Sequence, residues 1–194
     1  MLLPAQRIEV KSGLYGDLPG TLERVKTADV NAVVVPIEWP DLDSRLGIRI
    51  LGGWQVANLQ EIVASCELQL ARLERAMSAM AQKVPVVVSL TTLPLPPLFF
   101  TSPGVASAEK AKLFATVASF AASLATVPGV RILASQALDL ISPLNTRFDI
   151  KSEILTGFPY KLPFTSAFAG VLASLVPAPN PKKGLITDLD DTLW

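Results

Sequence analysis

Asn31-Ala-Val-Val-Val-Pro-Ile-Glu38 and Val86-Val-Val-Ser-Leu90 are the two stretches of this chain that decide its fold class. Both are short apolar runs rich in β-branched valine, and the first one stops at Trp39-Pro40. A continuous apolar run of this kind predicts a strand that is buried on both of its faces. Such strands are typical of parallel sheets that carry helices on both sides.

A long helix is expected between these two strands, from about Val56 to Gln82. Its apolar side chains step by three and four residues and therefore form one continuous stripe. The stripe consists of Leu59, Ile62, Val63, Cys66, Leu70, Leu73, Met77 and Met80. A second long helix is expected after Ser107, whose hydroxyl suits an N-cap, through about Ala125 and no further than Pro128-Gly129.

Shorter elements account for most of the remaining chain. Strands are expected at Arg7–Lys11 and Val130–Ala134, and helices at Thr21–Ala28, Ser135–Ile141 and Phe164–Val176. Residues 142–163 show no clear periodicity and are expected to be irregular. Because strands alternate with helices, the sequence predicts an α/β fold: a three-layer α/β/α sandwich of Rossmann-like type with a mainly parallel sheet.

The composition excludes several classes of function. The chain has 194 residues with 17 basic and 17 acidic side chains and no histidine. A nucleic-acid surface would show a basic excess, so no nucleic-acid partner is expected. Without histidine, one copy of the chain can form neither a Ser-His-Asp or Cys-His catalytic system nor a histidine-ligated zinc site. The single cysteine, Cys66, cannot form an intrachain disulfide, and its place on the apolar stripe predicts that it is buried.

The high apolar content raises the question of a membrane protein. Apolar residues make up 50% of the chain and the mean hydropathy is +0.42. However, the long charge-free stretch at residues 84–108 contains five prolines, which exclude a continuous spanning helix. The start of the chain, Met1-Leu-Leu-Pro4, lacks the basic and apolar regions of a signal peptide. We therefore expect a cytoplasmic protein with no membrane partner.

The end of the chain carries the motif with the clearest chemistry. Pro177-Ala-Pro-Asn-Pro181 predicts a stiff linker, and Lys182-Lys-Gly-Leu-Ile-Thr-Asp-Leu-Asp-Asp-Thr-Leu-Trp194 follows it. An apolar strand would deliver Asp188, with Asp190 two positions later. Two such carboxylates suit phosphoryl transfer: one attacks phosphorus, the other handles the leaving-group proton, and a hard cation such as Mg²⁺ neutralises the phosphate. A polar turn after an edge strand is the alternative reading.

This segment resembles motif one of the haloacid dehalogenase (HAD) superfamily, an apolar strand followed by Asp-x-Asp-x-Thr. The Lys-Lys pair and the closing Thr-Leu-Trp are similar to the FkbH-like branch (HAD subfamily IIIC), as are Phe148-Asp149 and Phe158-Pro-Tyr160 upstream. The resemblance implies that Asp188 is the nucleophile and Asp190 the general acid/base. It also implies that Asp188 and the backbone carbonyl of Asp190 are ligands of Mg²⁺.

The FkbH-like resemblance also implies a domain organisation and an activity. Residues 1–176 would form an amino-terminal domain of SGNH-hydrolase-like fold, residues 177–183 a Pro-rich linker, and residues 184–194 the first strand and motif one of a HAD domain. The complete protein would remove phosphate from a phosphorylated three-carbon acid such as 1,3-bisphosphoglycerate. It would then load the glyceryl group onto an acyl carrier protein for polyketide-type biosynthesis.

The later motifs of a HAD site do not follow Asp190 in this sequence. They are a Ser/Thr that binds phosphate, a Lys that balances its charge, and an acidic pair that completes the metal site. Because electrostatic stabilisation carries most of phosphoryl transfer, the chain alone is expected to lack phosphatase activity. We expect it to be the amino-terminal part of a longer protein whose HAD domain is missing. The orphan strand in residues 184–194 is expected to self-associate with another molecule or to fold back on the domain.

An SGNH-like domain would place a second site at the carboxyl edge of the sheet. Ser12 stands where the nucleophile of an SGNH esterase follows the first strand, and Asp149 stands in the late loop. Since serine without a base is a poor nucleophile, ester hydrolysis by Ser12 is not expected. Glu38 and Thr91 follow predicted strands at the edge where ligands of parallel sheets usually bind, so Ser12, Glu38, Thr91 and Asp149 form a candidate vestigial pocket. Solvated loop residues would give the same pattern, and a non-catalytic binding or docking module and a degenerate SGNH-type esterase stay open as alternatives.

Overall fold

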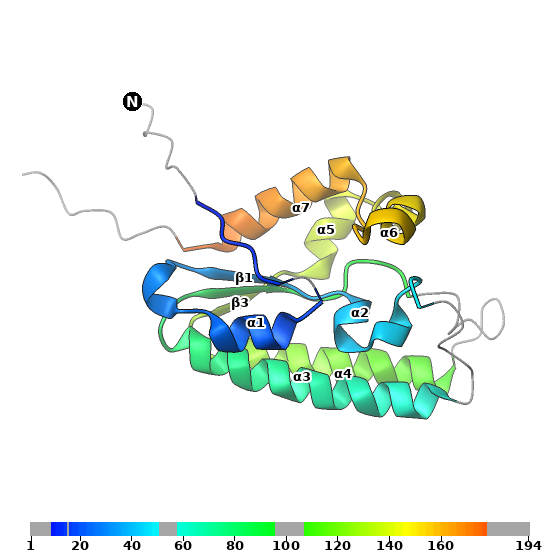
Figure 1. Ribbon diagram of the computed structural model, residues 1–194, viewed down its shortest axis with the longest axis horizontal. Coiled ribbons are helices and arrows are strands. Elements are labelled where there is room, and N and C mark those ends of the chain that lie inside the picture. The colour runs from blue at the N-terminus through cyan, green and yellow to red at the C-terminus, as the bar shows by residue number, and fades with distance from the viewer. Residues whose placement is uncertain (1–8, 15, 51–57, 96–106, 178–194) are drawn as a thin grey trace, which may run out of the picture.

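The protein has an α/β fold built on a small parallel sheet (Figure 1). The computed structural model describes residues 9–14, 16–50, 58–95 and 107–177. Within these ranges the sheet has three strands, β1 (Val33–Pro36), β2 (Val86–Ser89) and β3 (Val130–Ile132), in the order β1-β2-β3. Both neighbouring pairs are parallel, as the two valine-rich runs predict.

β2 is the central strand, and all four of its residues are buried. Val87 lies opposite Val34 of β1 and opposite Arg131 of β3. Because successive side chains of a strand point to opposite faces, Val86 and Val88 enter the core on one side of the sheet and Val87 enters the core on the other. The sheet therefore separates two apolar cores.

Two long helices cover one face of the sheet. α3 (Leu59–Ala81) and α4 (Ala108–Ala125) pack against each other there, and α1 (Leu18–Arg24) packs against α3 (Figure 1). All eight residues of the stripe predicted for the first long helix are buried, including Cys66. Ser107 caps α4 as predicted, because its Oγ accepts the N–H of Lys110 at 3.0 Å. These helices and the sheet enclose the larger core.

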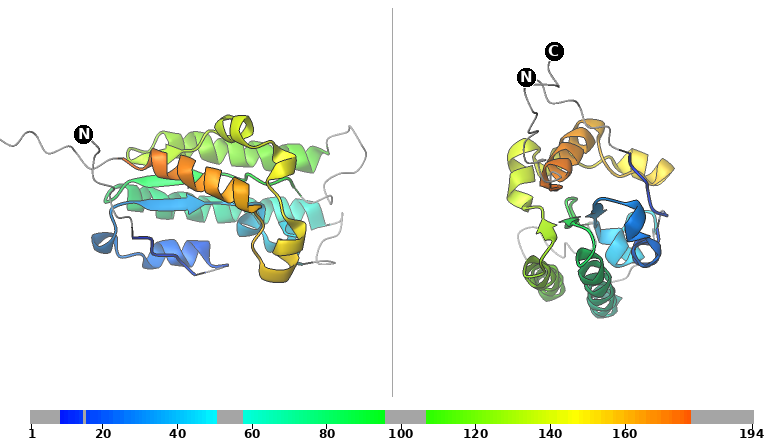
Figure 2. Two further views of the ribbon diagram at one scale, coloured as in Figure 1. Left: turned by 90° about the horizontal axis from the view of Figure 1, so that it is seen from above. Right: turned by 90° about the vertical axis from the view of Figure 1, so that its left-hand side faces the viewer.

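The opposite face of the sheet is covered by α5 (Ser135–Ile141) and α7 (Leu162–Leu175), as Figure 2 shows. Both helices lie close to where the periodicity of the sequence predicts them. The second core consists of Val87, Leu133, Leu138, Phe164, Phe168 and Leu172. Since α7 contacts β2, the sheet is anchored to this layer mainly through its central strand.

Shorter elements connect the strands and long helices. They are α2 (Trp39–Leu42), α6 (Ile150–Thr156) and the 3-10 turns η1 (Thr27–Asp29), η2 (Ser44–Leu46) and η5 (Leu144–Thr146). A tight turn leads from α4 into β3, with Gly129 at a φ of 86°. A Cβ on this glycine would lie 2.8 Å from the carbonyl oxygen of Ala81, so the position also has no room for a side chain.

The prediction of a strand at Arg7–Lys11 is wrong for the part that the structure describes. Residues 9–11 belong to no strand, because no described strand exchanges backbone hydrogen bonds with them. The helix expected at Thr21–Ala28 begins earlier, at Leu18. Asp17 explains this start, since its carboxylate caps α1 by accepting the N–H of Gly20 at 3.0 Å.

The prediction that residues 142–163 are irregular is also wrong, because they contain α6. Asp149 begins this helix: its carboxylate accepts the N–H of Ser152 at 2.9 Å. Gly157 ends it in the left-handed conformation with a φ of 84°. Local capping residues therefore set the two ends of α6.

Two further predictions concern the end of the chain and the absence of a membrane-spanning helix. The linker at residues 177–183, apart from Pro177, and the strand expected in residues 184–194 lie outside the described residues. Among the helices that the structure describes, none is long and apolar enough to cross a membrane.

Candidate functional site

Polar side chains from three distant parts of the chain meet at the carboxyl edge of the sheet. Glu38 follows β1, Thr92 follows β2, and Tyr160 lies between α6 and α7. Parallel strands end at the same edge of a sheet, which is why Glu38 and Thr92 come together although 54 positions separate them. Glu38 and Thr92 are buried, with 7% and 4% of their surfaces exposed.

The Glu38 carboxylate accepts hydrogen bonds from two peptide groups and two hydroxyl groups. The N–H of Thr92 lies 3.0 Å from each of its oxygens, and the N–H of Leu93 lies 3.2 Å from Oε2. The hydroxyl groups of Thr92 and Tyr160 both donate to Oε1, the latter at 3.0 Å. The carboxylate thus ties β1 to the end of β2 and to the segment before α7.

Burial raises the pKa of Glu38 to about 7, because it removes the charged form from water. The four donors act in the opposite direction and keep the rise in pKa smaller than burial alone would make it. The pKa of the Tyr160 hydroxyl is raised as well, first by burial and then by the neighbouring Glu38. Glu38 therefore exchanges its proton close to neutral pH while Tyr160 stays a hydrogen-bond donor.

Arg147 binds the carbonyl oxygen of Thr92 and is itself buried. It is 2% exposed, and its Nη1 donates to the carbonyl oxygen of Thr92 at 3.2 Å. Its Nε and Nη2 donate to the carbonyl oxygen of Ser142 at 2.8 and 2.6 Å, and Nη2 also donates to Asp139 at 2.6 Å. The guanidinium carbon lies 5.3 Å from the ring centroid of Phe164. The peptide group between Thr92 and Leu93 consequently links a buried acid to a buried base, because its N–H, that of Leu93, donates to Glu38 and its carbonyl oxygen accepts from Arg147.

Helix α2 fixes the orientation of Glu38 from the side of β1. Asp41 in the first turn of α2 accepts the backbone N–H of Glu38 at 2.8 Å. Trp39 donates from Nε1 to the carbonyl oxygen of Leu93 at 2.8 Å. Burial raises the pKa of Asp41 as well. The backbone on both sides of the Glu38 site is thereby held by a part-buried and a buried hydrogen bond.

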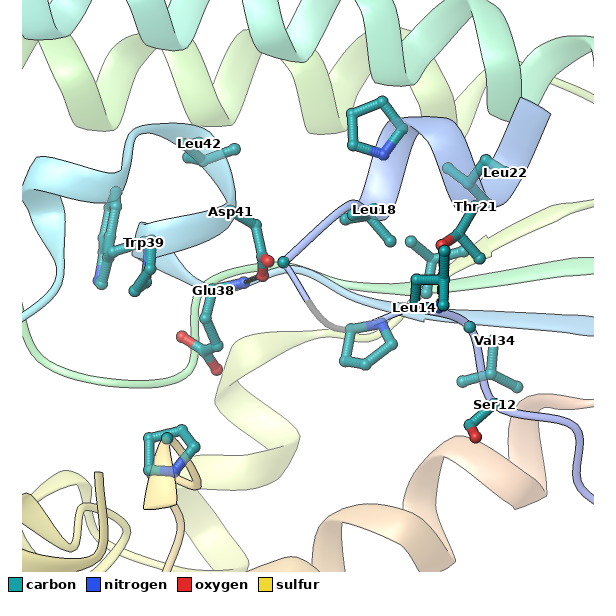
Figure 3. Close-up of a pocket in the computed structure, with 18 of the residues that line it drawn as sticks. Ser12, Leu14, Leu18, Thr21, Leu22, Val34, Glu38, Trp39, Asp41 and Leu42 are labelled. Carbon is teal, nitrogen blue, oxygen red and sulfur yellow. Dashed lines mark hydrogen bonds between the residues drawn. The ribbon is translucent and has the colours of Figure 1, made fainter. Parts of the chain in front are cut away.

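Glu38 stands at one end of an open groove of about 3310 Å³ (Figure 3). The groove runs past Val34 of β1 and the segment at residues 9–14, and it reaches α7 on the other side. In Figure 3 the Glu38 carboxylate and Ser12 lie at opposite sides of this groove. Its lining is largely apolar, and the acidic residues along it include Glu9, Asp29 and Glu153 as well as Glu38.

The structure brings together only part of the vestigial pocket that the sequence predicts. Glu38 occupies the expected sheet edge, and Thr91 is half-buried next to Thr92, which makes the contacts to Glu38. Ser12 is exposed and lies apart from Glu38, and Asp149 serves as the cap of α6. The sequence-predicted catalytic residues, Asp188 and Asp190, lie outside the described residues.

Sequence reasoning missed Tyr160 and Arg147 as members of this cluster. Tyr160 stands in Phe158-Pro-Tyr160, which served only as a mark of resemblance, and 122 positions separate it from Glu38. Arg147 stands in a segment without periodicity, and nothing in the local sequence indicates that it is buried. Both residues reach the site through the fold of the late loop, where Phe148 and Tyr160 form an antiparallel bridge.

The cluster can hold and release a proton at Glu38 and can orient a group that enters the groove. Among the residues that the structure describes, no three acidic, cysteine or histidine side chains stand close enough to hold a metal ion. The Mg²⁺ that the sequence motif implies would depend on Asp188 and Asp190. Neither a scan against protein-family models nor searches of the curated proteins and the solved structures found a match to this chain.

Proposed function

We propose that the chain combines an accessory domain with the first strand of a phosphoryl-transfer site of the HAD type. The accessory domain is a three-layer α/β/α sandwich of SGNH-like architecture, and the strand carries Asp188 and Asp190. The observation that carries this proposal is the sequence Lys182 to Trp194, in which an apolar run is followed by Asp-Leu-Asp-Asp-Thr.

The geometry of the described part favours an accessory role over independent catalysis. The buried acid Glu38 has hydrogen-bond donors on all sides, but the predicted nucleophile of an esterase, Ser12, does not lie beside it. For Glu38 to replace the missing histidine as the base, those two groups would have to lie within hydrogen-bond distance, or one water apart. The degenerate-esterase alternative is therefore the weaker proposal.

Each of the two carboxylates has a separate role in the proposed reaction. The Asp188 carboxylate attacks phosphorus of a phosphate ester or acyl phosphate, and the P–O bond to the leaving group breaks. Asp190 gives a proton to the departing oxygen and later takes one from the water that releases inorganic phosphate. Asp188 and the backbone carbonyl of Asp190 would hold Mg²⁺, which would neutralise charge on the phosphate. By resemblance, the substrate is a phosphorylated three-carbon acid that carries a phosphate ester and an acyl phosphate. Asp188 would remove the phosphate ester, and the thiol of an acyl carrier protein would attack the acyl carbon and displace the acyl phosphate's inorganic phosphate.

Complementation with a separate HAD-type domain tests this proposal. The chain alone is expected to release no phosphate from p-nitrophenyl phosphate in the presence of Mg²⁺. Mixing it with a HAD-type domain that lacks its own first strand is expected to restore activity, which is measured as inorganic phosphate. Asp188→Asn is expected to lower the restored rate by about a thousandfold or more, because it removes the nucleophile.

Asp191→Asn is the matched control, because Asp191 stands in the same segment at a position that the motif leaves variable. It is expected to keep the restored rate within about twofold. Equal rates for the Asp188→Asn and Asp191→Asn mixtures, or Mg²⁺-dependent activity of the chain alone, would contradict the proposal.

A docking role for the domain is a second candidate function, and one surface favours it. Exposed large apolar side chains are frequent in the segment from α5 to the start of α7: Leu140, Ile141, Leu144, Ile150, Ile154, Leu155, Phe158 and Leu162. Three of them, Ile150, Ile154 and Leu155, lie on α6. Apolar patches of this kind are typical of protein interaction sites. By resemblance, the acyl carrier protein is the partner that we propose for this surface.

Leu155→Lys is expected to weaken carrier binding about tenfold or more, because Leu155 is 71% exposed on α6 and a charge would be desolvated at the interface. Titration calorimetry with a carrier protein measures this. Leu68→Lys is the control, since Leu68 is 75% exposed on α3, on the other side of the sheet. The same affinity for both variants, or no binding by the unaltered chain, would count against docking at this surface.

A further inference from the structure

Glu153 is a buried acid that the Glu38 cluster does not use. It lies in the first turn of α6 with 6% of its surface exposed, and it lines the groove. The next two residues of the helix, Ile154 and Leu155, are more than half exposed. Glutamate side chains are almost never fully buried unless they are paired. Glu153 is therefore expected to have a partner.

The described part of the chain supplies only a distant charge for this carboxylate. Among the described residues, no group donates a hydrogen bond to the Glu153 side chain. Burial raises the pKa of Glu153, and the positive charge of Arg49, which also lines the groove, lowers it in part. A buried acceptor without a donor destabilises the fold. A ligand that brings an N–H group into the groove would remove this cost.

Two aromatic rings follow α6 and face the same groove. The rings of Phe158 and Tyr160, the aromatic pair, have centroids 5.7 Å apart and planes that meet at 88°. Phe158 is 41% exposed, so its ring is accessible to a ligand. The face of an aromatic ring carries partial negative charge and attracts ammonium groups. The aromatic pair therefore suits a cation and not an anion.

The fold places the aromatic pair between α6 and Glu38. Tyr160 donates from its hydroxyl to Glu38 at 3.0 Å, and its backbone bridges Phe148, which lies just before α6. In Figure 3 the Glu38 carboxylate points away from α2, toward the chain that carries Tyr160. Two carboxylates from different elements, Glu38 and Glu153, thus stand with the aromatic pair at the same end of the groove.

We propose that this end of the groove binds a primary alkylammonium ion. Its N–H groups donate to Glu153, its charge faces Glu38 and the ring of Phe158, and its alkyl chain runs along the apolar lining toward Val34. A metal ion fits less well, because no three acidic, cysteine or histidine side chains of the described residues stand close enough to hold one. The site goes beyond the phosphoryl-transfer proposal and does not depend on it.

Titration calorimetry of the full chain with hexylammonium chloride tests this site. The buffer is at pH 8, where Glu38 is ionised because its pKa is about 7. Hexanol has the same alkyl chain without the charge, and hexyltrimethylammonium has the charge without an N–H group. Hexylammonium is expected to bind at least about tenfold more tightly than either of them.

Glu153→Gln is expected to weaken hexylammonium binding about tenfold or more, because it removes the charge and keeps the shape of the side chain. Glu109→Gln is the matched control and is expected to keep the affinity within about twofold. Glu109 also lies in the first turn of a helix, α4, but on the other face of the sheet and outside the groove. Phe158→Leu keeps an apolar side chain without the ring and is expected to weaken binding about fivefold.

Any of four results would overturn the proposal. The first is no binding of hexylammonium by the unaltered chain. The second is equal affinity for hexylammonium and hexanol, which would leave an apolar groove without a cation site. The third is equal affinity for hexyltrimethylammonium, which would show that no N–H group is needed. The fourth is an equal loss in Glu153→Gln and Glu109→Gln, or no loss in Phe158→Leu, which decides the matter if Glu153→Gln does not fold.

Discussion

Glu38→Gln is expected to remove a large part of the pH dependence of stability between pH 4.5 and 7. The ordinary pKa of a glutamate is 4.5, and burial raises that of Glu38 to about 7. The folded state therefore holds this proton more tightly than the unfolded state does. As the pH rises through this window, the contribution of Glu38 to the free energy of unfolding falls by about 1.4 kcal/mol per unit, in total by about 3 kcal/mol.

Urea unfolding at pH 5, 6, 7 and 8 measures this effect. The unaltered chain is expected to lose stability between pH 5 and 7, and the Glu38→Gln variant is expected to lose about 2 kcal/mol less over these two pH units. The raised pKa values of Asp41 and Glu153 are present in both chains and cancel in the comparison. Glu23→Gln, on the exposed side of α1, is the control and should keep the slope of the unaltered chain. Parallel profiles for all three chains would refute the expectation.

Arg147→Met is expected to destabilise the fold by about 3–5 kcal/mol. Methionine matches the length of the arginine stem, but it donates no hydrogen bond to the carbonyl oxygens of Thr92 and Ser142. A buried acceptor that loses its donor costs about 1–3 kcal/mol. The contact with the ring of Phe164 is also lost. Asp139 adds little to this loss, because 60% of its side chain is exposed and water replaces the guanidinium.

Thermal unfolding followed by circular dichroism measures this change, and the midpoint is expected to fall by about 10 °C. Arg72→Met is the matched control. Arg72 also makes two hydrogen bonds to a carboxylate, that of Glu23, but both side chains are about half exposed. An exposed pair contributes about 0–1 kcal/mol, so the control should unfold close to the unaltered chain. Equal midpoints for the two variants would show that Arg147 is not a structural anchor.

The fold was predictable from the sequence where apolar periodicity carries the signal. The stripe from Leu59 to Met80 predicts α3, and the two valine runs predict β1, β2 and their parallel pairing. α6 could not be found in this way. Three of its apolar side chains, Ile150, Ile154 and Leu155, are exposed, and its buried residue is Glu153. The ends of this helix are set by an Asp N-cap and a Gly after its last residue, and its apolar side chains are exposed. Such a helix does not show the apolar periodicity of a helix that is buried along one face.

The sequence could predict only those residues of the candidate site that directly follow a predicted strand. Glu38 could be placed because it follows an apolar run, and the same reasoning placed Thr91 in the pocket. The structure selects Thr92, since its N–H and hydroxyl both face Glu38. Tyr160 and Arg147 depend on contacts across 122 and 55 positions, and a single sequence holds no local trace of such contacts.

The peptide group between Thr92 and Leu93 has a consequence for how the molecule unfolds. Its N–H is bonded to Glu38, which follows β1 of the sheet, and its carbonyl oxygen is bonded to Arg147, which also binds Asp139 of α5. The helices on this face cannot separate from the sheet without leaving a buried charged side chain or a peptide group unpaired. The two cores should accordingly melt together as one cooperative unit. In a scanning calorimeter this behaviour would appear as a single heat-absorption peak whose calorimetric and van't Hoff enthalpies agree.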